Sequence, residues 1–222
     1  MKKNIKLIVC MLVMVFVVAG MTGCGSKSET VKKESKESVS DKDKDTDKDD
    51  EKDTDNTDKD DNKDIDEEDG ELKTDVSDWE EYSYSDYSLK LSSDWEDMDY
   101  DAAELAFVHS GTAADGFAEN INTMTQDISA YDMDLDSYLD LTLDQYETLG
   151  YEVVGYKYMT INGVKGYYCI TSTEVESVTY YVSQWFTIVG DNAYIFTFAA
   201  DDEGFSELEE EVKDIYRTIE FK

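Results

Sequence analysis

Carboxylates are the commonest groups in this 222-residue chain that could do chemistry, with 54 Asp and Glu side chains against 20 Lys and Arg and a single His. Candidate acid/base sets are the pair Asp94 and Asp97 and the alternating series Asp132, Asp134 and Asp136. Such spacings arise by chance among so many acids, so solvated loop and helix-cap roles are favoured over general acid/base catalysis. His109 is expected to be a partly buried strand residue, and one histidine does not assemble a Ser-His-Asp set. The sequence therefore predicts no catalytic residue.

Thiol and indole groups are few. Cys169 lies in an apolar strand pattern at residues 167–170, so a buried and inert thiol is favoured over a nucleophile. Trp95 and Trp185 are expected in the core. Exposed aromatic side chains can stack on sugar rings or anchor a partner protein. Trp79 lies next to a highly polar segment and is the one candidate contact residue for a partner or ligand.

The N-terminal residues 1–23 have the pattern of a lipoprotein signal peptide. Three lysines precede an apolar run over residues 7–21 that is too short to span a bilayer comfortably. The run ends in Met21, Thr22, Gly23 and Cys24, which resemble the lipobox of bacterial lipoproteins. Cys24 would then become the lipidated N-terminus, and two or more acyl chains would hold it at the extracytoplasmic face of the membrane. An ordinary secretory signal cut nearby is the alternative.

Residues 24–75 read as a disordered acidic linker. Of residues 25–75, 33 of 51 are charged, with Asp-Lys and Asp-Thr-Asp repeats from 41 to 64. Such a composition cannot bury enough apolar surface to offset chain entropy. Alternating aspartates could supply oxygen ligands for calcium. An EF-hand loop, however, requires a Gly that is absent from the matching position after Asn62. A solvated spacer is therefore favoured, with weak cation buffering as an alternative and no specific metal site.

The net charge of −34 makes nucleic acid an implausible partner, because phosphate binding requires clusters of Lys and Arg. The acidity extends into residues 76–222, which carry 6 basic and 32 acidic side chains. This excess suits a basic partner, and avoidance of an anionic envelope explains it equally well.

Residues 76–222 have the length and aromatic content of one folded domain. Alternating patterns predict strands at 87–92, 105–110, 117–128, 151–161, 164–173, 178–189 and 193–200. Asn162-Gly163 is a strong type I′ hairpin signal, and a second tight turn is expected at residues 190–192. Consecutive hairpins predict an antiparallel sheet of about 6–7 strands.

Two segments have helical periodicity. Asp134 is suited to cap a helix over residues 135–149, and Gly150 is suited to end it. A second helix is expected at about 202–218, with an apolar stripe along one side and glutamates along the other. Both helices should pack on the faces of the sheet, which makes the domain an α+β sandwich preceded by a disordered tether.

Residues 84–95 read Tyr-Ser-Asp-Tyr-Ser-Leu-Lys-Leu-Ser-Ser-Asp-Trp and resemble the opening segment of PsbP-like domains of bacterial membrane lipoproteins. Further similar stretches are 119–122, the 135–149 helix, the Asn162-Gly163 hairpin and the closing helix and strand at 212–221. A serine stands at 92 and 93 where this Mog1p/PsbP-like group usually has proline. The resemblance implies an antiparallel sheet with helices on its faces. Members include photosystem accessory proteins, a nuclear-transport factor and bacterial lipoproteins, so the fold alone does not indicate the function.

The favoured hypothesis is a monomeric, non-catalytic, lipid-anchored module that presents this domain to a protein or small ligand outside the membrane. The histidine-containing cation sites of the photosystem members have no counterpart here, so neither a metal nor another cofactor is expected. An envelope enzyme or chaperone-like factor that uses unidentified carboxylates is one alternative. A surface protein that buffers cations through its acidic tether is the other.

Overall fold

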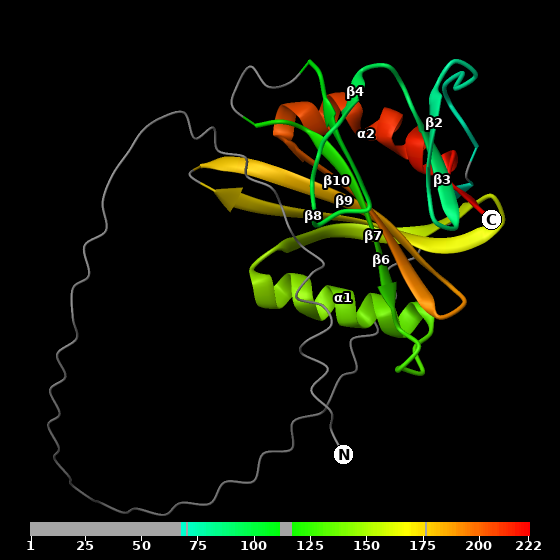
Figure 1. Ribbon diagram of the computed structural model, residues 1–222. Helices are drawn as coiled ribbons and strands as arrows, with labels where there is room; N and C mark the ends of the chain where they lie inside the picture. The colour runs from blue at the N-terminus through cyan, green and yellow to red at the C-terminus, as the bar shows by residue number, and fades with distance from the viewer. Residues whose placement is uncertain (1–67, 70, 112–116, 176) are drawn as a thin grey trace, which may run out of the picture. The chain divides into compact units, whose positions relative to one another are not determined.

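The computed structural model describes residues 68–69, 71–111, 117–175 and 177–222 (Figure 1). The strands are β1 (Glu68–Asp69), β2 (Glu80–Tyr84), β3 (Tyr87–Leu91), β4 (Trp95–Asp97), β5 (Leu105–His109), β6 (Asn120–Asp127), β7 (Glu152–Ile161), β8 (Val164–Val175), β9 (Val178–Val189), β10 (Asn192–Asp201) and β11 (Glu220–Phe221). The helices are α1 (Leu135–Leu149) and α2 (Asp202–Arg217). Neither described helix has the length and apolar character needed to cross a bilayer. The predicted signal peptide, the predicted lipobox and most of the predicted acidic linker lie outside the described residues.

A large sheet has the order β1-β7-β8-β9-β10-β6-β5-β4, and every neighbouring pair except β1 with β7 is antiparallel. The predicted antiparallel sheet is therefore confirmed, and the parallel β1 adds a strand that was not predicted. Asn162 and Gly163 both have positive φ, at 48° and 81°, as a type I′ turn requires. Gly190, with φ 61°, lies in the next tight turn, between β9 and β10.

The structure departs from the predicted strands in the bounds of β6 and in a second, smaller sheet. β6 begins at Asn120 rather than at residue 117, because Phe117 belongs to a small cluster under β9 and β10 instead of the ladder. β2 pairs with β3, and β11 pairs with the other edge of β3, so a second sheet of order β11-β3-β2 forms beside the first. Alternation does not reveal β2, because only one of its five side chains is even partly buried.

Both helices pack on the large sheet, as predicted, and the structure places them on opposite faces of it (Figure 1). Alternate residues of the central strands divide between two cores. Trp185, Phe196 and Phe198 pack in the core that contains the apolar stripe of α2. Phe186 and Ile195 pack with α1 in the other core. The alternation follows from the period of two along a strand.

The ends of α1 are those expected from the sequence. The Asp134 carboxylate accepts a hydrogen bond from the Ser137 N–H at 2.8 Å. The hydrogen bond from the Ser137 side chain, together with this backbone bond, lowers the pKa of Asp134. Gly150 ends the helix in the left-handed region, with φ 82°. α2 begins in the same way, because the Asp201 carboxylate accepts from the Gly204 N–H.

Residues 71–75, which the sequence analysis placed in the linker, include contacts with the domain. The Lys73 N–H donates to Asp214 Oδ1 at 3.0 Å, and Lys73 Nζ lies 2.5 Å from Glu210 Oε2. Both acceptors belong to α2. The chain is therefore attached to the domain before residue 76.

Candidate functional site

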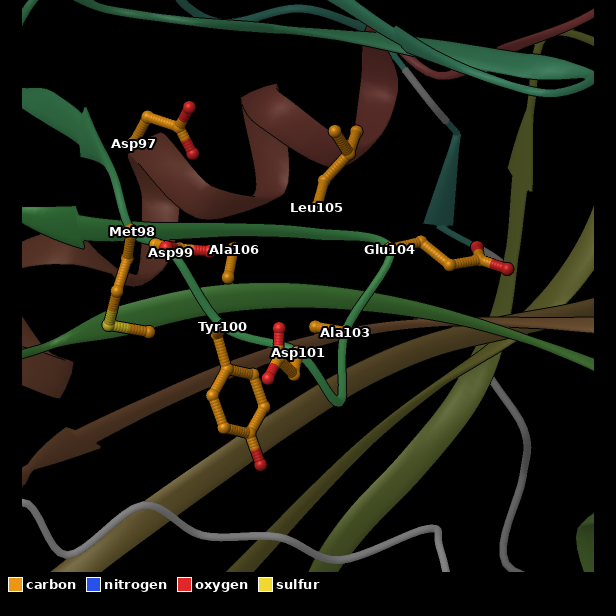
Figure 2. A pocket seen from close by; sticks show the side chains of 9 residues that line it. All are labelled: Asp97, Met98, Asp99, Tyr100, Asp101, Ala103, Glu104, Leu105 and Ala106. Atoms are coloured by element: carbon orange, nitrogen blue, oxygen red, sulfur yellow. The ribbon is translucent and has the colours of Figure 1, made fainter.

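A pocket of about 530 Å³ lies where the chain passes from β4 to β5 (Figure 2). It is lined by Asp97, Met98, Asp99, Tyr100, Asp101, Ala103, Glu104, Leu105 and Ala106. The connecting loop is held at both ends, because the Met98 N–H donates to the Ala106 carbonyl and the Glu104 N–H to the Thr123 carbonyl. These bonds join the loop to β5 and β6 at the edge of the large sheet, so the position of the loop depends on both strands.

The Glu104 side chain is held by hydrogen bonds from two strands of the domain. Its Oε2 accepts from the Tyr87 hydroxyl at 3.0 Å and from Thr125 Oγ1 at 2.9 Å. Burial holds the pKa of Tyr87 well above its usual range, so this phenol stays protonated and keeps its proton for donation. The position of this carboxylate therefore depends on β3 and β6.

The pocket is negatively charged, because four carboxylates and no basic side chain line it. Figure 2 shows the carboxylate of Asp97 on one side of the loop and that of Glu104 at the far end, while the Tyr100 ring projects in another direction. The acids surround the pocket instead of converging on one point. Within the described part of the chain, no group of three or more His, Cys, Asp or Glu side chains is arranged to hold a metal ion. The arrangement suits an extended cationic group better than a small ion.

The acidic sets noted in the sequence are not brought together at this pocket. Of Asp94 and Asp97, only Asp97 lines it. Asp134 caps α1, and Asp136 Oδ1 accepts from the hydroxyls of Tyr158 and Tyr167, both at 2.8 Å. The predicted helix-cap role is confirmed for Asp134.

The tryptophans and His109 have mainly packing contacts. Trp95 and Trp185 are 3% and 0% exposed, so their predicted core positions are confirmed. Trp79, the candidate contact residue, packs partly buried against the same core and does not line the pocket. His109 ends β5 with its ring edge-on to Trp95, at 5.1 Å between centroids, and is partly buried as predicted.

The thiol of Cys169 is 1% exposed in β8, and burial raises its pKa to about 12. A thiol at that pKa is almost wholly protonated at neutral pH and is a poor nucleophile. The predicted buried position is therefore confirmed.

Sequence reasoning did not identify Asp99, Tyr100, Asp101 or Glu104 as pocket residues. The alternation of acids at 97, 99 and 101 was the available signal. In a chain with 54 acidic residues it does not stand out. The lining residues all fall within residues 97–106, but their acidic pattern alone does not show that the segment folds around a pocket.

No protein-family model matches the chain, and no curated protein sequence matches it. Solved structures similar to it include PsbP (CyanoP) from Synechocystis sp. PCC 6803, at 12% identity and TM-score 0.48 over 64% of this chain and 92% of that one. LpqN of Mycobacterium tuberculosis, described as involved in cell envelope biogenesis, is similar at 16% identity and TM-score 0.49, over 60% of this chain and 81% of LpqN. The Ran-binding protein Mog1p of Saccharomyces cerevisiae is similar at 10% identity and TM-score 0.44, over 63% of this chain and 96% of Mog1p.

The α+β architecture expected from the sequence resemblance, an antiparallel sheet with helices packed on it, is present in this chain. At 10–16% identity the similarity concerns the fold alone. It assigns no ligand, partner or activity to this chain.

Proposed function

We propose that this chain is a non-catalytic binding module, lipid-anchored through Cys24 at the extracytoplasmic face of the membrane, and that its pocket between β4 and β5 takes a basic group of a partner or ligand. The supporting observation is the pocket lining, which contains four carboxylates and no cation. Carboxylates attract Lys, Arg or amine groups and raise the rate of encounter with them.

The size and lining of the pocket favour a side chain or polyamine over a hydrated ion. A volume of about 530 Å³ is within the range of small-ligand sites. Tyr100 adds an aromatic ring to the lining, and aromatic faces attract cations. Glu104, held by Tyr87 and Thr125, provides an acceptor that does not have to be ordered when the ligand binds.

The enzyme alternative would gain support from acids with raised pKa values gathered in one pocket. The carboxyl groups with shifted pKa values include Asp134, Glu210 and Asp214, and each shift is downward. None of these three lines the pocket. They are a helix cap and members of ion pairs, so their shifts have structural causes.

Calorimetric titration of the mature chain with a short Lys/Arg-rich peptide tests the pocket. The variant Asp97→Asn/Asp99→Asn/Asp101→Asn should bind about tenfold or more weakly. A matched control removes three exposed acids of α1, as Asp140→Asn/Asp144→Asn/Glu147→Gln, and should bind within about twofold of the wild type. Equal weakening in both variants would show a diffuse charge effect and contradict the proposal.

Metabolic labelling with a clickable fatty acid tests the anchor. The wild type and a Cys169→Ala control should be labelled, and Cys24→Ala should not. Labelling of Cys24→Ala at the wild-type level would exclude lipidation at this residue.

A further inference from the structure

A row of side chains crosses the large sheet beside the acidic pocket. Ala106, which lines the pocket, lies opposite Asn122 of β6, and Asn122 lies opposite Thr197 of β10. The Met98 N–H donates to the Ala106 carbonyl, so Met98 extends this row beyond β5. Residues that lie opposite one another on paired strands direct their side chains to the same face. The four side chains therefore share one face of the sheet.

This face is the one on which α1 packs. Met124 is two residues from Asn122 on β6 and lies opposite Ile195 of β10. Ile195 packs in the core that contains α1. Because side chains alternate along a strand, Asn122 and Met124 project to the same face, and the row belongs to the α1 side of the sheet.

The loop of the pocket contributes side chains to the same face. Figure 2 shows Met98, Tyr100 and Ala106 projecting to one side of the β5 ribbon and Leu105 projecting to the other. Leu105 packs against the core that contains α2, which agrees with the placement of the other three on the α1 side. Together with two residues of β6 they form a continuous surface next to the pocket. We name it the β6 surface, and its residues are Met98, Tyr100, Ala106, Asn122 and Met124.

The side chains of the β6 surface are apolar or neutral, in contrast to the acids of the pocket. Met98, Tyr100, Asn122 and Met124 are partly exposed, whereas Ala106 is buried. Methionine side chains are flexible and polarisable, so they adapt to apolar partners of different shapes. The Asn122 amide offers two donor hydrogens and one acceptor oxygen, which are the groups that a peptide bond pairs with. The surface thus combines adaptable apolar contacts with the means to bind a peptide backbone.

The charge beside the β6 surface indicates which partner fits it. Asp97, Asp99 and Asp101 lie in the same loop as Met98 and also line the pocket. Methionines bordered by carboxylates complement a ligand that combines basic with apolar side chains, whereas a polyamine would use the carboxylates alone. Neighbouring strands lie about 4.8 Å apart, so the row from Met98 to Asn122 spans about 10 Å, the length of about three extended residues. This size suits a short polypeptide segment.

We propose that the ligand of the acidic pocket is a polypeptide segment of a partner protein in which a Lys or Arg lies within about three positions of an apolar residue. The basic group enters the pocket, the apolar side chain packs on Met98 and Met124, and Asn122 pairs with the peptide backbone. This inference rests on the proposed function, which assigns a basic group to the pocket, and it adds the chemical class of the partner. Apolar contact with the methionines distinguishes this partner from other cations, which charge alone would not do.

Calorimetric titration of the mature chain with two hexapeptides of equal charge tests this proposal. One peptide contains two Lys, two Leu and two Gly, and the other has Ser in place of each Leu. The wild type should bind the Leu peptide about tenfold or more tightly, because its Leu side chains leave water on the methionines. In Met98→Ser/Met124→Ser the two affinities should lie within about twofold of each other. The conservative Met98→Leu/Met124→Leu should keep the preference, because it keeps the apolar contact.

Val175→Ser/Val178→Ser is the matched control, because it removes two exposed apolar side chains from the β8–β9 hairpin and should leave the preference unchanged. Equal affinity of the wild type for both peptides overturns this inference and leaves the proposed function standing. A preference for Leu that survives in Met98→Ser/Met124→Ser places the apolar contact elsewhere and also overturns it. If the wild type binds neither peptide, the proposed function fails and this inference fails with it.

Discussion

Replacement of Arg217 by Met should destabilise the domain strongly, because it leaves the Asp214 carboxylate buried without its cation. Arg217 Nη1 lies 2.8 Å from Asp214 Oδ1, and the two side chains are 0% and 1% exposed. Removal of one partner from a buried pair costs about 3–5 kcal/mol. Asp214 keeps its bond from the Lys73 N–H, so we expect the lower end, about 3 kcal/mol. That is a large part of the 5–15 kcal/mol typical of a domain.

Urea unfolding followed by the fluorescence of the buried Trp95 and Trp185 measures this effect. With a slope of about 2 kcal/mol per M, the midpoint should fall by about 1.5 M. Lys73→Met is the matched control, because Lys73 pairs with Glu210 of the same helix, α2. It removes a pair with Glu210 in which both side chains are more than half exposed, and it should cost about 1 kcal/mol or less.

The double variant Asp214→Leu/Arg217→Met separates the cost of an unpaired charge from the loss of a favourable pair. If desolvation of the lone carboxylate causes the loss, this variant should be more stable than Arg217→Met and lie within about 1 kcal/mol of the wild type. A loss below about 1 kcal/mol in Arg217→Met, or a double variant no more stable than the single one, would refute the reasoning.

Three other changes give further tests. Gly166→Ala should lower the free energy of unfolding, measured by thermal denaturation, by about 1–3 kcal/mol, because the added Cβ would lie 2.6 Å from the Phe186 carbonyl oxygen and from the Trp185 ring. Gly155→Ala is the control and should leave the stability nearly unchanged, because nothing lies within 4 Å of a Cβ at that position. Hydrogen bonds from Lys73 and Lys213 lower the pKa of Glu210 from 4.5 to about 2. The difference in unfolding free energy between the wild type and Glu210→Gln should therefore have its full value above about pH 5 and vanish as the pH falls toward 2. A difference that is unchanged at pH 2 would contradict this. Cys169 should resist iodoacetamide at pH 8 until urea unfolds the domain, and rapid native alkylation would show that the thiol is accessible.

Local signals predicted the helices and hairpins well. The Asp134 cap and the Gly150 stop involve hydrogen bonds between residues close in the chain. The Asn162-Gly163 turn depends on two backbone angles that these residue types favour. Such features are recognisable in the sequence because they require no distant partner.

The short strands were harder to predict for the opposite reason. β4 has three residues, and only Trp95 among them is buried, so it has no periodic pattern of its own. β1 is an acidic dipeptide that pairs with residues about ninety positions later. Their strand conformation depends on the neighbouring strand, β5 or β7, that supplies the hydrogen bonds.

The sequence by itself determined the acidity, the α+β class, both helices with their ends, and the central strands with their core aromatics. Only the tertiary structure decided what particular carboxylates do. Asp214 is buried in an ion pair with Arg217. The Asp136 carboxylate accepts hydrogen bonds from two tyrosine hydroxyls, and Glu104 is held at the pocket by hydrogen bonds from Tyr87 and Thr125. The physical reason is that the burial and partners of a charge depend on segments far away in the chain, whereas amphipathic periodicity and capping are local.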